Sequence, residues 1–193
     1  MNKICNIGIN DYQGKVYINK RHIKSYGAWR NMIYRCYNNN NLKTRPTYKD
    51  VKVCDEWLYF SNFKKWFDDN YRFDLEEQGI KLELDKDLLS ENGKIYSPQT
   101  CIFLPSQING FISDRTSNNK SGFVGVSWKK DYKKWAATIK IFGTNKYKHL
   151  GYFKDKQEAF ETYKISKVIE IKKVKNFLKK LGYNEKIIEK IGG

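Results

Sequence analysis

Residues 121–163 read SGFVGVSWKKDYKKWAATIKIFGTNKYKHLGYFKDKQEAFETY, and their pattern decides the fold of the second half of the chain. Apolar and polar residues alternate in three short runs, at 123–128, 135–141 and 146–153, and this period is typical of β-strands. Short, turn-forming segments separate the runs. The stretch therefore predicts a three-stranded antiparallel sheet.

A long helix is predicted directly after the third strand. Asp155 stands where a helix N-cap belongs, and Glu158 follows three residues later in a capping-box arrangement. Apolar residues continue at helical spacing as far as Leu181, and Gly182 marks the end of the helix. A last short helix is predicted over 185–191. The long helix gives the sheet a surface to pack on.

Four blocks of this region occur together in a recognisable order, at 121–126, 134–139, 149–153 and 158–163. Their order and spacing resemble the DNA-binding domain of plant ethylene-response factors, the APETALA-type domain, which also occurs fused to phage and bacterial endonucleases. The resemblance covers about residues 120–165. It implies a sheet that lies in the major groove of double-stranded DNA and is backed by one helix.

The resemblance also assigns candidate contacts with DNA. The base-facing positions of the family fall on Val124, Ser127, Lys129, Thr138, Lys140, Tyr147 and His149, and Lys133 in the first turn is a further candidate. Several of these positions hold Arg or Trp in the plant proteins, and this chain keeps few of them. Because Arg is the usual bidentate reader of guanine, the GC-rich preference of the plant domains is not expected here. Thr and Tyr suit thymine-rich sites or backbone contacts better.

Basic charge is concentrated in the same half of the chain. The 193 residues include 37 Lys and Arg against 21 Asp and Glu, a net charge of +16. Residues 113–193 carry a net charge of +12, and residues 1–112 carry only +4. A strongly basic half beside a nearly neutral half suggests that the second half binds a polyanion. The alternative explanation of this charge is that the whole protein is rich in lysine and that these lysines only face solvent.

A polar, turn-prone stretch divides the chain at 113–122, and its composition is typical of a linker. The sequence thus predicts two domains, 1–112 and 123–193, in the α+β class. The first is a helical and hairpin domain, and the second is the three-stranded sheet packed on its long helix. Within the first domain, apolar residues at helical spacing predict helices over about 26–37 and 55–70.

The first domain contains a second set of motifs: Trp29-x-x-Met32-x-x-Arg35-Cys36-Tyr37-Asn38, Val53-Cys54-Asp55-Glu56-Trp57, Leu84-Asp85-Lys86-Asp87 and Tyr96-Ser97-Pro98-Gln99-Thr100-Cys101. They make residues 25–112 similar to the HNH-like proteins of phages and prophages. The resemblance implies a nuclease in which one divalent metal, held by a hairpin and a helix, stabilises the leaving oxygen during phosphodiester hydrolysis.

The HNH resemblance places a metal site. Asp85 falls where the first ligand belongs, on a strand, and Ser97 and Pro98 fall at the start of the following helix, with Asn109 further along it. Asp85, Asp87 and Asn109 are therefore the candidate ligands. Carboxylate and amide oxygens are hard ligands, which suit Mg²⁺ or Mn²⁺.

The chain departs from the HNH pattern at two positions: Lys86 stands where the general base is usual, and Thr100 stands where Asn is usual. The neighbouring Asp85 and Asp87 favour the charged form of Lys86. Glu83, Asp85 and Asp87 share one face of a strand, so an acidic row is available. The alternatives to a catalytic site are a solvated acidic strand and a nuclease that has lost its activity.

The leading expectation is a sequence-specific double-stranded DNA-binding protein that acts as a phage-type, homing-like, metal-dependent endonuclease. One rival is a catalytically inactive DNA-binding regulator or phage counter-defence protein, and another is an RNA- or protein-binding module. No run of 18 apolar residues occurs, so no membrane partner is expected. The first residues lack the layout of a signal peptide, which predicts a cytoplasmic location in a bacterial host.

Overall fold

The computed structural model describes residues 3–112 and 121–192 of the chain. The chain divides into two compact units, Met1–Leu104 and Pro105–Gly193. Helices and small sheets occur in both units, so the predicted α+β class is confirmed. Most of the predicted linker, 113–120, lies outside the described residues.

The division between the units precedes helix α5 (Ser106–Ile112), which the sequence analysis placed at the end of the first domain. Within the second unit, the Lys167 side chain contacts this helix. Its ammonium donates a hydrogen bond to the backbone carbonyl oxygen of Phe111 at 2.9 Å and lies 4.5 Å from the centre of the Phe111 ring. These contacts explain why α5 groups with the second unit.

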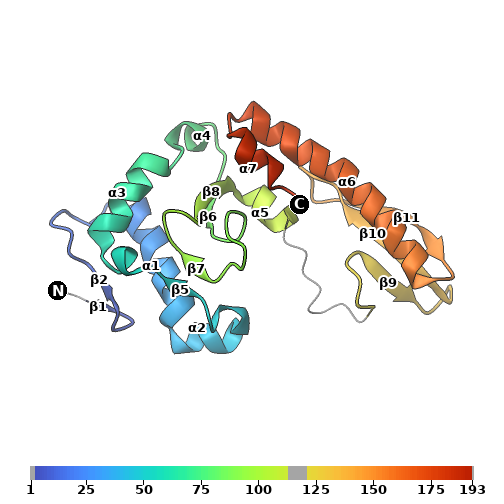
Figure 1. The fold of residues 1–193 in the computed structure, drawn as a ribbon, viewed down its shortest axis with the longest axis horizontal. Coiled ribbons are helices and arrows are strands. Elements are labelled where there is room, and N and C mark those ends of the chain that lie inside the picture. The colour runs from blue at the N-terminus through green and yellow to red at the C-terminus, as the bar shows by residue number, and fades with distance from the viewer. Residues whose placement is uncertain (1–2, 113–120, 193) are drawn as a thin grey trace. The chain divides into compact units, whose positions relative to one another are not determined.

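The first unit is built from short strands and helices (Figure 1). Its strands are β1 (Lys3–Ile4), β2 (Gly8–Ile9), β3 (Tyr17–Ile18), β4 (Arg21–His22), β5 (Lys52–Val53), β6 (Leu82–Asp85), β7 (Ile95–Tyr96) and β8 (Ile102–Pro105). Its helices are α1 (Lys24–Tyr37), α2 (Asn39–Thr44), α3 (Phe60–Asn70) and α4 (Phe73–Glu77), with 3₁₀ turns η1 (Pro46–Tyr48) and η2 (Asp55–Leu58). The helix expected at 26–37 is present as α1, and the one expected at 55–70 is present as η2 and α3.

Aromatic side chains fill the space between α1 and α3. Trp29 on α1 is fully buried, as are Phe60, Phe63 and Phe67 on α3, and their spacing in the sequence is that of one helix face. The indole N–H of Trp29 donates to the backbone carbonyl oxygen of Trp57 at 2.7 Å. The one polar atom of the Trp29 side chain therefore keeps a hydrogen-bond partner inside the core.

The helix expected to begin at Ser97 does not form, and that prediction is wrong. The Thr100 hydroxyl accepts a hydrogen bond from the Ser97 backbone N–H at 3.1 Å and donates to the carbonyl oxygen of Ile95 at 2.8 Å, which closes a turn. The next residues form β8, which pairs with β6 and is mostly buried. An apolar run that ends in proline suits a paired, extended segment better than a helix.

The second unit contains the predicted three-stranded sheet, which is antiparallel in the order β11-β10-β9. Its elements are α5, β9 (Val126–Lys129), β10 (Lys134–Lys140), β11 (Tyr147–Phe153), α6 (Lys156–Lys180) and α7 (Glu185–Glu189). The first strand begins three residues later than expected. Gly122 and Gly125 have φ angles of +79° and +72°, so the chain turns there before it extends.

Helix α6 covers one face of this sheet (Figure 1). Val126 and Ala137 of the sheet and Ala159 of α6 are at most 1% exposed and form the centre of the core between them. Two of these side chains are single methyl groups. The helix and the central strand therefore approach each other closely.

The start of α6 is capped as predicted. The Asp155 carboxylate accepts hydrogen bonds from the backbone N–H groups of Gln157 at 2.7 Å and Glu158 at 3.1 Å. These N–H groups have no acceptor within the helix, so the cap stabilises its first turn. At the other end, Gly182 adopts a φ angle of +74°, which terminates the helix.

A β-bulge in β11 decides which side chains face away from α6. Ala137 pairs with Gly151, whereas the next residue, Thr138, pairs with His149, so Leu150 is an extra residue without a partner in the register. With regular alternation along β11 and no bulge, Leu150 would face away from α6 and His149 would face toward it. The bulge instead places His149 on the opposite face, and Leu150 packs against the core.

We predict that Gly125→Ala destabilises the second unit by about 3 kcal/mol or more, because a methyl group there adds a clash to backbone strain. A Cβ at Gly125 would lie 2.2 Å from the Tyr163 ring and 2.7 Å from the carbonyl oxygen of Thr138. Gly143→Ala is the control, because Gly143 also has a positive φ (+76°) but open space around it. Urea unfolding measures both variants. Equal losses would contradict the proposed clash.

Glu170 connects α6 to the turn between β10 and β11. Its carboxylate accepts a hydrogen bond from the Phe142 backbone N–H at 2.8 Å and pairs with the Lys173 ammonium at 2.5 Å. Burial opposes the ionisation of Glu170, but Lys173 and the Phe142 N–H outweigh it and hold the pKa of this carboxyl below its ordinary value. The ionised form is therefore part of the folded structure.

We expect Glu170→Gln to destabilise the protein by about 1–2 kcal/mol at neutral pH, since a charge-assisted hydrogen bond is lost. Because the folded-state pKa is lowered, the contribution of Glu170 is present above the ordinary value of 4.5 and is lost as the pH falls through the lowered pKa. Unfolding at neutral pH and at about pH 3 tests this. Glu161→Gln, which breaks an exposed pair with Lys164 on the same helix, should have little effect. A loss for Glu170→Gln that does not change with pH would refute the ionic role.

Candidate nucleic-acid interface

The sheet face opposite α6 carries most of the predicted DNA contacts. Residues paired directly across antiparallel strands share a face, and side chains alternate along each strand. Ala137 faces α6, so its neighbours Ala136 and Thr138 face the other way, together with their partners across the strands. By this register the following predicted residues share the face, which we call the open face: Ser127, Lys129, Thr138, Lys140, Tyr147 and His149.

Two other predicted contacts lie outside the strands. Lys133 is exposed in the turn between β9 and β10, where its φ angle is +46°. Val124 lies in the turn that precedes β9, so the prediction that it belongs to the first strand is wrong. The neighbouring Gly125, with its positive φ, explains why the strand does not reach Val124.

The open face is aromatic as well as polar. Tyr147 on this face is 70% exposed, Tyr152 is 41% exposed, and Tyr132 in the adjoining turn is 59% exposed. The rings of Tyr132 and Tyr152 stack with their centres 4.6 Å apart, and the His149 ring lies 4.5 Å from that of Tyr152. Exposed aromatic rings beside lysines are typical of surfaces that bind bases and sugar–phosphate chains.

Sequence reasoning missed Tyr132 and Tyr152 as candidate contacts. Tyr152 directly precedes Phe153, which packs against the core, so alternation alone places Tyr152 on the opposite face. The signal for Tyr132 is weaker, since it lies in a turn and only its stacking on Tyr152 brings it to this surface. Neither corresponds to a base-facing position carried over from the resemblance.

Positive charge on the sheet has few acidic neighbours. Residues 126–153 contain seven lysines and one acidic residue, Asp131, a net charge of +6. Carboxylates of α6 and α7 pair instead with lysines of the same two helices, in the pairs Glu161–Lys164, Glu170–Lys173 and Glu185–Lys179. The sheet segment and α6 both carry net positive charge, +6 over residues 126–153 and +5 over residues 156–180, and the sheet segment has the fewer carboxylates.

In the first unit, Asp85 ends β6, and its carboxylate takes part in the fold. The residue is 8% exposed, and its Oδ1 atom accepts hydrogen bonds from the backbone N–H groups of Asp87 at 3.0 Å and Leu88 at 2.8 Å. Burial raises the pKa of this carboxyl, against the effect of those two hydrogen bonds. Asp85 thus closes the turn that follows the strand.

Lys86 and Asp87 form an ion pair in the same turn. The Lys86 side chain is 8% exposed, and its Nζ atom lies 2.5 Å from Oδ1 of Asp87. The ammonium also lies over the rings of Tyr48 and Tyr96, 5.4 and 5.8 Å from their centres. The Nζ atom of Lys86 is thus engaged by one carboxylate and two aromatic rings.

This arrangement does not fit Mg²⁺ or Mn²⁺. Oδ1 of Asp85 is occupied by two N–H groups, and the Asp87 carboxylate pairs with a lysine. Asn109, the third predicted ligand, lies on α5. Glu83, the other member of the acidic row, pairs with Lys81 at 3.6 Å. A divalent metal needs several oxygen ligands directed at one point. In the part of the chain that the structure describes, no three His, Cys, Asp or Glu side chains are placed to hold a metal.

Comparison of the chain with protein-family models, curated proteins and solved structures found no match. The two resemblances seen in the sequence are therefore expectations that these comparisons leave open. None of the helices within residues 3–112 and 121–192 has the length and apolar character needed to cross a bilayer.

We predict that Asp85→Ala lowers the free energy of unfolding by about 1–3 kcal/mol, because two partly buried backbone N–H groups lose their acceptor. Asp85→Asn keeps an acceptor oxygen and should retain most of the stability. Glu91→Ala, which removes an exposed carboxylate from the same loop, is the control and should be nearly neutral. Urea unfolding at neutral pH compares the three variants. An Asp85→Ala variant as stable as the wild type would refute this structural role.

Proposed function

We propose that this protein binds double-stranded DNA through the open face of the β9–β10–β11 sheet. The observation that supports the proposal most strongly is that six of the predicted contacts share one face, within a segment of net charge +6. A small twisted sheet fits the major groove, where side chains reach the edges of the bases. The lysines would neutralise phosphates, and Thr138, Tyr147 and His149 would offer hydrogen-bonding groups to the bases.

The composition of the open face favours phosphate contacts over the reading of guanine. The last arginine of the chain is Arg115, so the sheet has lysines and no arginine. Lysine contacts a phosphate well as a point charge, but it lacks the planar fork with which Arg reads guanine. We therefore propose a modest sequence preference, directed toward thymine-rich sites.

For the first unit, we propose a role that does not involve catalysis, which makes the whole protein a DNA-binding regulator or counter-defence protein. The use of the Asp85 carboxylate as a backbone acceptor supports this choice over a nuclease. The metal-dependent endonuclease is the competing proposal, and it requires Asp85 and Asp87 to leave their present partners. A cytoplasmic location would give either protein access to DNA.

The DNA-binding proposal predicts a steep dependence of affinity on salt concentration. The triple variant Lys129→Ala, Lys133→Ala, Lys140→Ala should weaken binding to a duplex and reduce the slope of log affinity against log salt by about 3, since each phosphate contact contributes about 0.9. The matched control, Lys172→Ala, Lys180→Ala, Lys190→Ala, removes the same charge from exposed positions on α6 and next to α7. Fluorescence anisotropy with a labelled duplex measures both. The same change in both variants would mean that the open face is not the binding surface.

A cleavage assay separates the regulator from the nuclease. Wild type and Asp85→Asn are incubated with phage and host genomic DNA and either Mg²⁺ or Mn²⁺, and new DNA ends are sequenced. We expect no recurrent ends with either protein. Recurrent ends that disappear in Asp85→Asn, a variant expected to fold, would overturn the regulator and establish the nuclease.

A further inference from the structure

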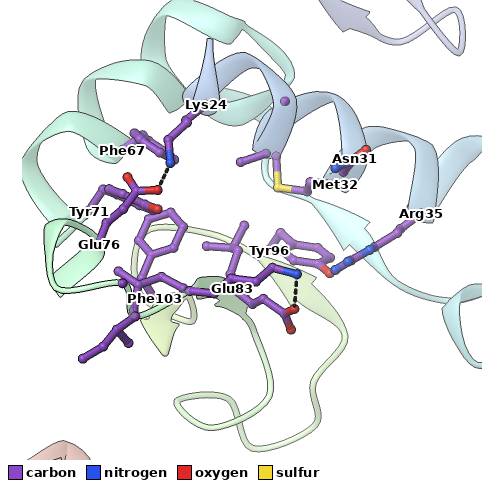
Figure 2. Close-up of a pocket in the computed structure, with 17 residues that line it drawn as sticks. Lys24, Asn31, Met32, Arg35, Phe67, Tyr71, Glu76, Glu83, Tyr96 and Phe103 are labelled. Atoms are coloured by element: carbon purple, nitrogen blue, oxygen red, sulfur yellow. Dashed lines mark ion pairs between the residues drawn. The ribbon is translucent and has the colours of Figure 1, made fainter. Parts of the chain in front are cut away.

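A pocket with a volume of about 610 Å³ opens in the first unit between α1, the end of α3 and β6 (Figure 2). This volume lies within the range of small-molecule sites in proteins. Its lining combines polar and charged residues with apolar and aromatic ones, the latter including Met32, Phe67, Tyr71, Tyr96 and Phe103. Tyr71 is half-buried and the other three rings are buried, so the ring of Tyr71 is the aromatic surface most open to a flat apolar body.

The charged residues that line the pocket leave one positive charge unbalanced. They are three cations and two carboxylates. Lys24 pairs with Glu76, and Lys81 pairs with Glu83 at 3.6 Å, with both lysines largely exposed. The guanidinium of Arg35 donates a hydrogen bond to the Tyr96 hydroxyl and senses the charge of Glu83, but it forms no ion pair with any described residue. Arg35 is thus the cation that a ligand would meet.

The polar groups are placed at the ends of the pocket. Figure 2 shows the Arg35 guanidinium beside the oxygen of Tyr96 at one end, and the Lys24–Glu76 pair at the other. Phe103 and Met32 lie between these ends. A ligand could therefore place an anionic group at the Arg35 end and an apolar body between the two ends.

We propose that this pocket binds an organic monoanion, a carboxylate or sulfonate carried by a flat apolar body. The anionic group lies on Arg35, whose planar fork suits two oxygens of such a group. The body lies against the aromatic wall formed by Tyr71 and Phe103. A single negative charge balances the net charge of the lining residues. The site is independent of DNA binding by the second unit.

The test uses two fluorescent probes of nearly the same shape, 8-anilinonaphthalene-1-sulfonate and its uncharged analogue N-phenyl-1-naphthylamine. The full-length protein should bind the sulfonate with a stoichiometry of one, and the uncharged probe at least about tenfold more weakly, since it cannot pair with Arg35. Equal affinity for the two probes would overturn the role of the anionic group. No binding of the sulfonate would overturn the site.

Gly27→Leu is the decisive variant. Gly27 lines the pocket from α1, and a Cβ there meets no atom within 4 Å, so the new side chain fills the pocket without displacing the core. The variant should lose the bound sulfonate. Gly110→Leu is the control, because Gly110 on α5 has equally open space and does not line this pocket. If Gly27→Leu binds the probe as the wild type does, the probe lies elsewhere and the proposal fails.

Arg35 is tested separately from the shape of the pocket. Arg35→Gln keeps a hydrogen-bond donor for Tyr96 but removes the charge, so its affinities for the two probes should become nearly equal. Circular dichroism establishes that the variant is folded before the titration. A folded Arg35→Gln that still prefers the sulfonate would assign the anion to another cation.

Discussion

The close packing of small side chains between α6 and the central strand is the constraint on which the second unit depends. Ala137 and Ala159 bring the helix so near to the sheet that large polar side chains have no room at the centre of that face. Gly125 belongs to the same close approach, since any Cβ there would meet the ring of Tyr163. The open face carries Ser127, Thr138, Tyr147 and His149, while the α6 side also holds Lys148 and the exposed Trp128. The surface proposed to bind DNA is thus a result of the core.

The sequence predicted correctly those strands and helix ends that are determined by residues close to them in the chain. The three strands follow from alternation, and the start of α6 follows from Asp155, because a cap depends only on the next few residues. The prediction of a helix beginning at Ser97 was wrong because the structure there depends on residues far away in the chain. Ser followed by Pro resembles a helix start, but here the Thr100 hydroxyl closes a turn, and β8 then pairs with β6. That pairing depends on a strand many residues earlier, which no local signal reports.

The site was predictable to the extent that face and register follow from alternation. The positions on β9 and β10 could be assigned in this way, but the bulge at Leu150 could not, since it depends on how two strands pair. For Asp85, the position was predictable from the sequence but the role of its carboxylate was not. A carboxylate after a strand serves equally well as a metal ligand or as an acceptor for the next two backbone N–H groups, and only the geometry shows the second use.

A lysine-rich composition does not by itself account for the charge of the sheet. Lysines spread by composition would occur on both halves and would be accompanied by carboxylates in the usual proportion. Residues 126–153 instead contain seven lysines and a single acidic residue, whereas α6 contains eight lysines and three glutamates, of which Glu161 and Glu170 pair with lysines of the same helix. Unpaired like charges on one small sheet repel each other, which costs stability unless a polyanion is bound. The scarcity of carboxylates on the sheet thus adds to the shared face of the predicted contacts as a reason to look for a nucleic acid on the open face.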